Sequence, residues 1–197
     1  MVNIILASGS ASRRSLLSGA GIQAQAIKPN VDEDAAKRAM RADKLSVCDQ
    51  AMQLAEMKAI KISSQVDGLV IGGDQMLNLD GTAFDKPHNL DAATKHLKKL
   101  SGKTHTLETA IVIAENGAPV WRHMARPTLT VRTLSDGFIN AYIKSCGPPL
   151  LSTVGAYQLE GMGAQIFSKI EGDYFSILGL PLLPLLDYFR TRGLLET

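Results

Sequence analysis

The sequence predicts an α/β protein with a mixed β-sheet, and three observations support this class. Short apolar runs of strand length occur at residues 2–7 and 68–73. Between them, through residues 34–64, apolar residues recur at the three- and four-residue spacing of an amphipathic helix. Residues 104–134 contain two segments with a strand pattern, joined at an Asn-Gly turn that is typical of an antiparallel pair. Alternating helical and extended segments indicate strands covered by helices.

The N-terminal elements follow in order. The strand at residues 2–7 leads through the loop SGSAS into a helix. Ser10 is a good N-cap for this helix, because its hydroxyl can accept a backbone N–H, and Gly21 follows the helix end. Residues 34–64 form a helix in two pieces, and the strand at residues 68–73 comes next.

The C-terminal elements begin with an amphipathic helix over residues 90–100, which has an acid near its start and lysines near its end, as the helix dipole prefers. After the antiparallel pair, SDGFINAYIKSC forms a short helix with Ser135 or Asp136 as its N-cap. Residues 155–178 contain a loop and a strand. The last helix begins at a proline and ends near Gly193.

Length and composition indicate an ordinary globular chain. Its 197 residues can bury a core as one domain or as two closely packed lobes. A hydrophobic fraction of 45% with 20% charged residues is typical of soluble proteins. The net charge of +2 is too small to indicate a nucleic-acid partner, so any anion site must be local.

Cysteine usage and the chain termini indicate a cytoplasmic protein. Cys48 and Cys146 are far apart and belong to no metal-binding or disulfide pattern, which suits a reducing compartment. The start, MVNIILAS, has no basic leader. The apolar segment ILGLPLLPLLDYF contains two prolines and falls short of the about 20 residues that span a membrane, so we expect a core helix there and no membrane partner.

The first loop has the features of a phosphate cradle. With Ser10 as N-cap, Arg13 and Arg14 lie in the first turn of the helix, where the helix dipole is already positive. Backbone N–H groups and an arginine fork at such a position suit a phosphate. The alternative, in which both arginines extend into solvent, is equally compatible with the sequence.

A second candidate site follows the apolar run VIGG. We expect the strand to end at Gly72 and Gly73 and to present Asp74 where a metal ion or a water molecule would be held, with the glycines making room for a ligand. An ordinary turn is the alternative for these three residues alone. Glu33, Lys58 and Lys86 lie on loops or near helix ends and add charge, although each taken singly is compatible with a solvated surface residue.

Taken together, these residues resemble a known family. The chain is similar over almost its whole length to the Maf family of nucleoside triphosphate pyrophosphatases. The resemblance rests on ordered segments with loose spacing: LASGSASRRSLL, VDE, AEMKA, IGGDQML, DKP, LSGKTHTLETA and GAYQLEGMGAQIFSKIEGDYFSILGLPL.

The resemblance implies a fold and a reaction. The fold is α/β and two-lobed, with an elongated, twisted mixed sheet flanked by helices and a nucleotide cleft between the lobes, formed by a single domain over residues 1–197. The reaction is hydrolysis of a nucleoside triphosphate to a monophosphate and pyrophosphate, with Mg²⁺ or Mn²⁺ as cofactor. A homodimer is also implied.

The same resemblance assigns roles to individual residues. Asp74, Lys58, Lys86 and Arg13 match catalytic positions, with Asp74 accepting a proton from water. Glu33 and Asp74 match the metal ligands, whose oxygen atoms suit magnesium or manganese. The substrate-binding positions are Ser8, Ser10, Ser12, Gln75 and Glu160.

The base that the protein prefers stays open at this point. Gln75 and Glu160 resemble the branch that acts on 7-methyl-GTP, and a carboxylate could accept hydrogen bonds from a guanine edge or oppose a methylated, cationic base. Ser12 stands where that branch has a tryptophan and the dTTP branch has an arginine. The alternative function is a nucleotide-binding regulator of septum formation or cell division with little turnover.

Overall fold

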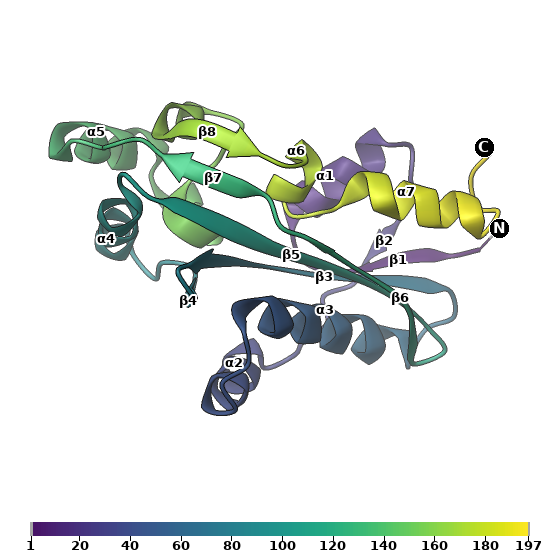
Figure 1. Cartoon of the computed structure of the whole chain (residues 1–197). Helices are drawn as coiled ribbons and strands as arrows, with labels where there is room; N and C mark the ends of the chain where they lie inside the picture. Colours follow the sequence, from purple (N-terminus) through teal and green to yellow (C-terminus); the bar gives the residue numbers. More distant parts are fainter. Residues whose placement is uncertain (1, 197) are drawn as a thin grey trace. The chain divides into compact units, whose positions relative to one another are not determined.

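The computed structural model describes residues 2–196, and its contacts divide them into two compact units. The first unit comprises the residues up to Gln75, Thr109–Ala125 and the residues from Asp173 on. The second unit comprises Met76–Glu108 and Arg126–Gly172. Helices flank strands in this structure, so the predicted α/β class with a mixed sheet is confirmed (Figure 1).

The strands of the first unit pair in the order β2-β1-β3-β5-β6. They are β1 (Ile4–Ala7), β2 (Gln25–Ala26), β3 (Leu69–Leu79), β5 (Thr104–Glu115) and β6 (Ala118–Ala125). Strand β1 is parallel to both β2 and β3, whereas β6 is antiparallel to β5. The first unit therefore contains both pairing types. Strands β3 and β5 also continue into the second unit.

Helices cover both faces of these strands. They are α1 (Ala11–Gly19), α2 (Glu33–Ala42), α3 (Val47–Ser63), α6 (Tyr174–Ile177) and α7 (Leu182–Thr191). Neighbouring residues of β1 point to opposite faces: Leu6 packs with Leu17 of α1 and Phe189 of α7, while Ile5 packs with Ile62 of α3. In Figure 1, α3 accordingly lies on the face of β1 and β3 opposite to α1 and α7.

The second unit pairs its strands in the order β4-β3-β5-β7-β8. Its further elements are β4 (Thr82–Phe84), α4 (Leu90–Leu100), β7 (Thr128–Val131), α5 (Asp136–Cys146), the 3₁₀ turns Pro148–Ser152, Val154–Ala156 and Met162–Ile166, and β8 (Phe167–Glu171). Strand β4 is antiparallel to β3, and β7 is antiparallel to both β5 and β8. Helix α4 packs against α5 and the first two 3₁₀ turns.

Most predicted boundaries are confirmed. Ser10 and Ser135 cap their helices through side-chain oxygens that accept the backbone N–H three residues on. The long helical segment is indeed two helices, α2 and α3. The last helix follows Pro181 and ends two residues before Gly193, whose φ of +67° lies in the left-handed region.

Two strand predictions are wrong. Strand β3 does not end at the paired glycines but runs on through Asp74 to Leu79, because its last three residues, 77–79, pair with β4. The segment expected as one strand after the Asn-Gly turn is two strands, β6 and β7. Pro127 separates them because it has no N–H to donate to a ladder, and its carbonyl accepts instead from the Leu107 N–H at 3.0 Å.

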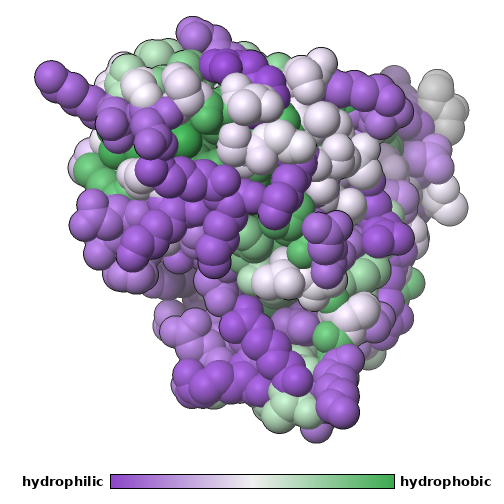
Figure 2. Space-filling model, turned by 60° about the vertical axis from the view of Figure 1, so that its left-hand side comes forward, coloured by the Kyte–Doolittle hydropathy of each residue, from purple (hydrophilic) through white to green (hydrophobic). Residues whose placement is uncertain are grey.

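Within residues 2–196, no helix combines the length and the apolar character that crossing a bilayer requires. The apolar C-terminal segment instead supplies Leu182, Leu185 and Phe189 to the core of the first unit, as the sequence predicts. On the face that Figure 2 draws, apolar surface occurs as small areas among hydrophilic residues.

Candidate active site

The paired glycines of β3 make room for protein groups. A Cβ at Gly72 would collide with the carbonyl oxygen of Ala55 and would lie 2.7 Å from the backbone nitrogen of Ala59, so only glycine lets α3 approach β3 this closely. A Cβ at Gly73 would lie 3.1 Å from Nε of Arg13. These glycines therefore have a packing role in the protein itself, and the expectation that they also make room for a nucleotide stays a prediction.

The close approach of α3 to β3 brings one lysine against two acids. Lys58 of α3 places its ammonium nitrogen 2.6 Å from Oδ1 of Asp74 on β3 and 2.9 Å from Oε1 of Glu33 on α2. The residues Lys58 and Asp74 are each 6% exposed, while the Glu33 side chain is 41% exposed. The structure thus joins three predicted site residues in one charged cluster with a buried and an open end.

Arg13 enters the same unit from the first turn of α1. Its Nε donates to the carbonyl of Gly179 at 2.7 Å, and its Nη1 donates to Oγ of Ser8 at 3.2 Å. Burial lowers the pKa of this guanidinium, and the charges of Asp74 and Glu33 raise it. Arg13 therefore lies within electrostatic reach of both acids while two hydrogen bonds fix the plane of its fork.

The loop before α1 is held by its own serines. Oγ of Ser8 accepts from the backbone N–H of Ser10 at 3.1 Å, in addition to the Arg13 contact. Ser12 and Arg14 are exposed on α1. Arg13 therefore turns inward, whereas Arg14 faces solvent, so the alternative in which both arginines extend into solvent is wrong for Arg13. The phosphate cradle stays a prediction.

The side-chain amide nitrogen of Gln75 donates its hydrogen bonds within the protein. Its Nε2 lies 2.9 Å from Oγ1 of Thr109, 3.0 Å from the carbonyl of Ser176 and 3.1 Å from that of Ile177. Backbone carbonyls only accept hydrogen bonds, so these partners determine the orientation of the amide. The predicted substrate-binding residue thus directs both N–H groups at protein atoms.

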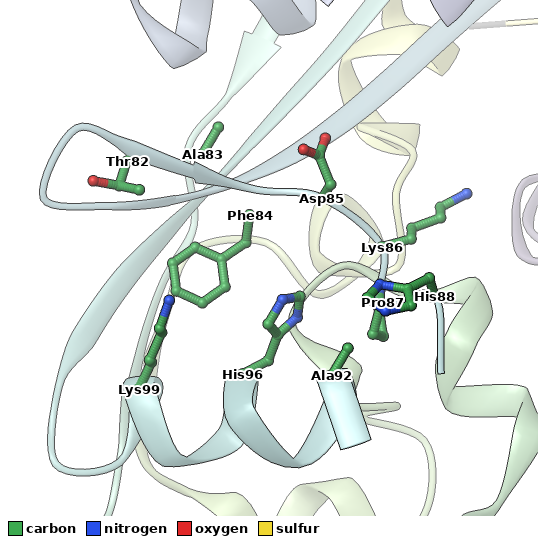
Figure 3. Close-up of a pocket in the computed structure, with 10 residues that line it drawn as sticks. All are labelled: Thr82, Ala83, Phe84, Asp85, Lys86, Pro87, His88, Ala92, His96 and Lys99. Atoms are coloured by element: carbon green, nitrogen blue, oxygen red, sulfur yellow. The ribbon is translucent and has the colours of Figure 1, made fainter. Parts of the chain in front are cut away.

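Lys86 belongs to the second unit, where it follows β4. The segment Asp85–His88 borders a hollow of about 290 Å³ whose wall includes Phe84, His96 and Lys99. The Phe84 and His96 rings meet edge to face with their centroids 5.0 Å apart. Figure 3 shows the exposed Lys86 side chain extending away from these two rings. The Lys86 ammonium therefore lies outside the aromatic part of the hollow.

Glu160 also belongs to the second unit and is exposed on a loop that buried aromatic residues anchor. Tyr157, three residues earlier, has its hydroxyl 2.7 Å from Nε2 of His105 and packs edge to face on Phe167. The Tyr142 hydroxyl accepts from the backbone N–H of Gln158 at 3.4 Å. His105 therefore helps to anchor the loop that carries Glu160.

His105 makes this anchor sensitive to acid. Burial lowers the pKa of His105 from 6.5 to about 4, so the unfolded chain binds a proton that the folded protein excludes between these values. Stability due to this residue is complete above pH 6.5 and is lost as the pH falls towards 4. Relative to His105→Gln, the wild type should lose about 2 kcal/mol more unfolding free energy between pH 7.5 and pH 5, measured by urea denaturation. Equal losses in the two proteins would contradict this origin.

The chain is similar to known proteins. The sequence profile of the family described as Maf-like protein matches residues 3–192. The chain belongs to this family. It is 65% identical over 194 residues to a nucleoside triphosphate pyrophosphatase of Hyphomonas neptunium, covering 98% of each chain.

Two further relatives carry informative names. A nucleoside triphosphate pyrophosphatase of Caulobacter vibrioides is 48% identical, with 98% of this chain and 96% of the relative covered. A protein of Rhizobium meliloti named 7-methyl-GTP pyrophosphatase is 46% identical, with 98% of each chain covered. Relatives of this Maf-like protein thus carry both a general and a base-specific name.

Sequence reasoning missed several residues that hold this site. Thr109 is buried and accepts the Gln75 amide, and Gly179 supplies the carbonyl that holds Arg13. Both lie in segments that carry the family resemblance, so a signal was present. The resemblance gave Thr109 and Gly179 no role, because a sequence pattern does not reveal which groups distant along the chain become hydrogen-bond partners.

The acid pair has the donor chemistry for a divalent cation. Among residues 2–196, no three histidine, cysteine or acidic side chains gather as a ready-made metal site. Magnesium in nucleotide sites, however, commonly takes one or two carboxylates and completes its shell with phosphates and water. The carboxylates of Asp74 and Glu33 are brought together by their contacts with the same Lys58 ammonium, and both supply the oxygen ligands that such a cation takes. These residues fit a cation that arrives with a triphosphate.

Proposed function

We propose that this Maf-like protein hydrolyses nucleoside triphosphates to nucleoside monophosphates and pyrophosphate by water attack on the α-phosphate. The observation that carries the proposal is the cluster in the first unit, where Lys58 contacts Asp74 and Glu33 and where Arg13 is buried within their electrostatic reach. Phosphoryl transfer depends mainly on positioning and on charge stabilisation, and this cluster offers both.

In this proposal, Asp74 orients the attacking water and accepts its proton. A general base must lie at the reacting centre in a fixed orientation, and the contact of 2.6 Å with Lys58 fixes the Asp74 carboxylate. Lys58 and Arg13 provide positive charge against the negative charge that grows on the leaving pyrophosphate. Ser8 and Ser10 hold the loop beside Arg13, where backbone N–H groups at the start of α1 face an anion.

The proposed cofactor is Mg²⁺ or Mn²⁺, with Asp74 and Glu33 as its protein ligands. When bound, such a cation polarises water and neutralises phosphate charge. The chain itself contributes oxygen ligands on two separate elements, β3 and α2. Glu33 is the more exposed of the two, so we expect it to bind the cation from the solvent side.

Lys86 and Glu160 complete the proposal for the second unit. The family resemblance assigns Lys86 a catalytic charge and Glu160 a part in choosing the base; Ser12, which belongs to the first unit, is assigned to substrate binding separately. Support for a methylated guanine comes from the relative named 7-methyl-GTP pyrophosphatase, and support for a wider range comes from the relatives with the general name. We also propose a cytoplasmic location, which suits two cysteines, Cys48 and Cys146, that form no disulfide, and a homodimer.

Glu160 provides a specific prediction about base choice. Glu160→Gln keeps the shape of the side chain and removes its charge, so the ratio of kcat/KM for 7-methyl-GTP to that for GTP should fall about tenfold while the best unmethylated substrate loses little. The ratio is measured by steady-state pyrophosphate release. An unchanged ranking of bases would remove Glu160 from the specificity site.

A substrate panel tests the proposed function itself. Purified protein with Mg²⁺ or Mn²⁺ is given canonical triphosphates and 7-methyl-GTP, and the products are separated and counted. We expect one pyrophosphate for each monophosphate. Orthophosphate as the product would support a phosphatase instead. Binding without turnover across the panel would favour the regulator of septum formation or cell division.

A further inference from the structure

We infer that Gln75 and Thr109 are positioning residues, which hold the turn after α6 so that its last carbonyl orients Arg13. The inference rests on the proposed function, in which Arg13 faces the phosphates, and it gives Gln75 a role other than base recognition. All the groups involved belong to the first unit.

The first step is the hold on α6. Gln75 on β3 donates to the carbonyls of Ser176 and Ile177, and Oγ1 of Thr109 on β5 donates to the same Ser176 carbonyl at 3.1 Å. Thr109 in turn accepts from the Gln75 amide. Two neighbouring strands thereby hold the C-terminal end of α6, a helix of only four residues that is too short to be stable alone.

The opposite end of α6 is fixed separately. Asp173 caps the helix, with Oδ2 accepting from the backbone N–H of Ser176 at 2.7 Å and from its hydroxyl at 2.6 Å. Ser176 itself is 1% exposed. Side chains therefore hold both ends of the short helix, and these contacts fix its position.

The second step connects α6 to Arg13. The Ser176 carbonyl also accepts from the backbone N–H of Gly179 at 3.1 Å, which closes the turn. Gly179 has a φ of +101°, a conformation that side chains disfavour. Its carbonyl then accepts from Nε of Arg13 at 2.7 Å. A continuous series of hydrogen bonds thus runs from Gln75 through Ser176 and Gly179 to the guanidinium.

The burial of these residues separates positioning from substrate contact. Thr109 is completely buried, so a ligand has no access to its hydroxyl. Gln75 is partly exposed, but its donor groups face the protein. Because an arginine that clamps a phosphate works through its direction, a small displacement of the Gly179 carbonyl should weaken catalysis without changing which base is preferred.

The experiment compares Gln75→Met, Thr109→Val and Thr109→Ser with the wild type. Gln75→Met keeps the length of the side chain but removes its donors. Thr109→Val keeps the shape but removes the hydroxyl, and Thr109→Ser keeps the hydroxyl. In Gln75→Met and Thr109→Val, we expect kcat/KM to fall by about a hundredfold for every triphosphate. The order in which the bases are preferred should not change. Thr109→Ser should recover most of that loss.

An NMR measurement reads the positioning directly. The Nε–H resonance of Arg13, assigned by its disappearance in Arg13→Lys, should exchange with water on the order of tenfold faster in Gln75→Met and Thr109→Val than in the wild type. The signal does not depend on turnover. It therefore decides the positioning role even if the wild type releases no pyrophosphate, an outcome that would count against the proposed function alone.

A double-mutant cycle tests whether the effect passes through Arg13. In the Arg13→Lys background, which lacks the Nε–H contact, Gln75→Met should cost little further activity. A full additional loss in that background would overturn the inference. A changed base ranking with an unchanged Arg13 signal would also overturn it and would return Gln75 to base recognition. If Gln75→Met does not fold, the Thr109 pair makes the same test.

Discussion

Asp74→Asn is expected to reduce pyrophosphate release roughly a thousandfold, the range in which loss of a general base falls. The substitution keeps the size of the side chain and an oxygen that accepts from Lys58, but it removes the negative charge that would accept a proton and bind a cation. Substrate binding should weaken far less than turnover, because Arg13 and Lys58 keep their charges. Steady-state rates and an equilibrium binding measurement with a non-hydrolysable triphosphate separate the two effects.

Glu56→Gln provides the matched control for Asp74→Asn. Glu56 lies on α3 two residues before Lys58, and its carboxylate is 2.6 Å from Nε of Arg122 in a pair whose side chains are both partly exposed. Removing a charge there should change the rate and the stability very little. An Asp74→Asn enzyme with a rate close to that of Glu56→Gln would exclude Asp74 as the base.

Gly72→Ala is expected to destabilise the protein by about 3 kcal/mol, since the added methyl group would meet the backbone of α3. A loss of this size lowers the melting temperature by roughly 10 °C in a chain of this length. Because α3 carries Lys58 and β3 carries Asp74, the displacement should also lengthen their contact and lower activity. Thermal unfolding followed by circular dichroism measures the first effect.

Gly19→Ala serves as the control for Gly72→Ala. Gly19 is the last residue of α1, and a Cβ there would meet nothing within 4 Å. Alanine should leave the melting temperature unchanged or raise it slightly, because it restricts the unfolded chain. If both alanine variants melt like the wild type, the close packing of α3 on β3 does not need the glycine.

Local patterns were sufficient to predict most of the fold. The sequence predicts Ser10 as a cap and Ser135 as one of two candidates, because N-capping depends on a side chain and a backbone group only three residues apart. The helices α3 and α4 followed from their apolar spacing. Strand β3 was underestimated because its second half is defined by pairing with β4, and a glycine pair resembles a strand end in the sequence.

The residues of the site could be predicted from the sequence, but the contacts that join them could not. The charges at Arg13, Lys58 and Asp74 were visible in the sequence, but the contact between α3 and β3 that joins two of them depends on Gly72, whose role is steric. Gln75 is assigned to substrate binding only through the family resemblance. Its actual partners, Ser176 and Ile177, lie a hundred residues later, and no local pattern indicates such contacts.

Hydrolysis in ¹⁸O-labelled water tests the central claim most directly, because the label marks the phosphorus atom that water attacks. Wild-type protein is incubated with its best triphosphate and a divalent cation, and both products are analysed by mass spectrometry. Attack on the α-phosphate, as proposed for the cluster of Asp74, Lys58 and Arg13, predicts one ¹⁸O atom in the monophosphate and none in the pyrophosphate. Label in the pyrophosphate would contradict this account.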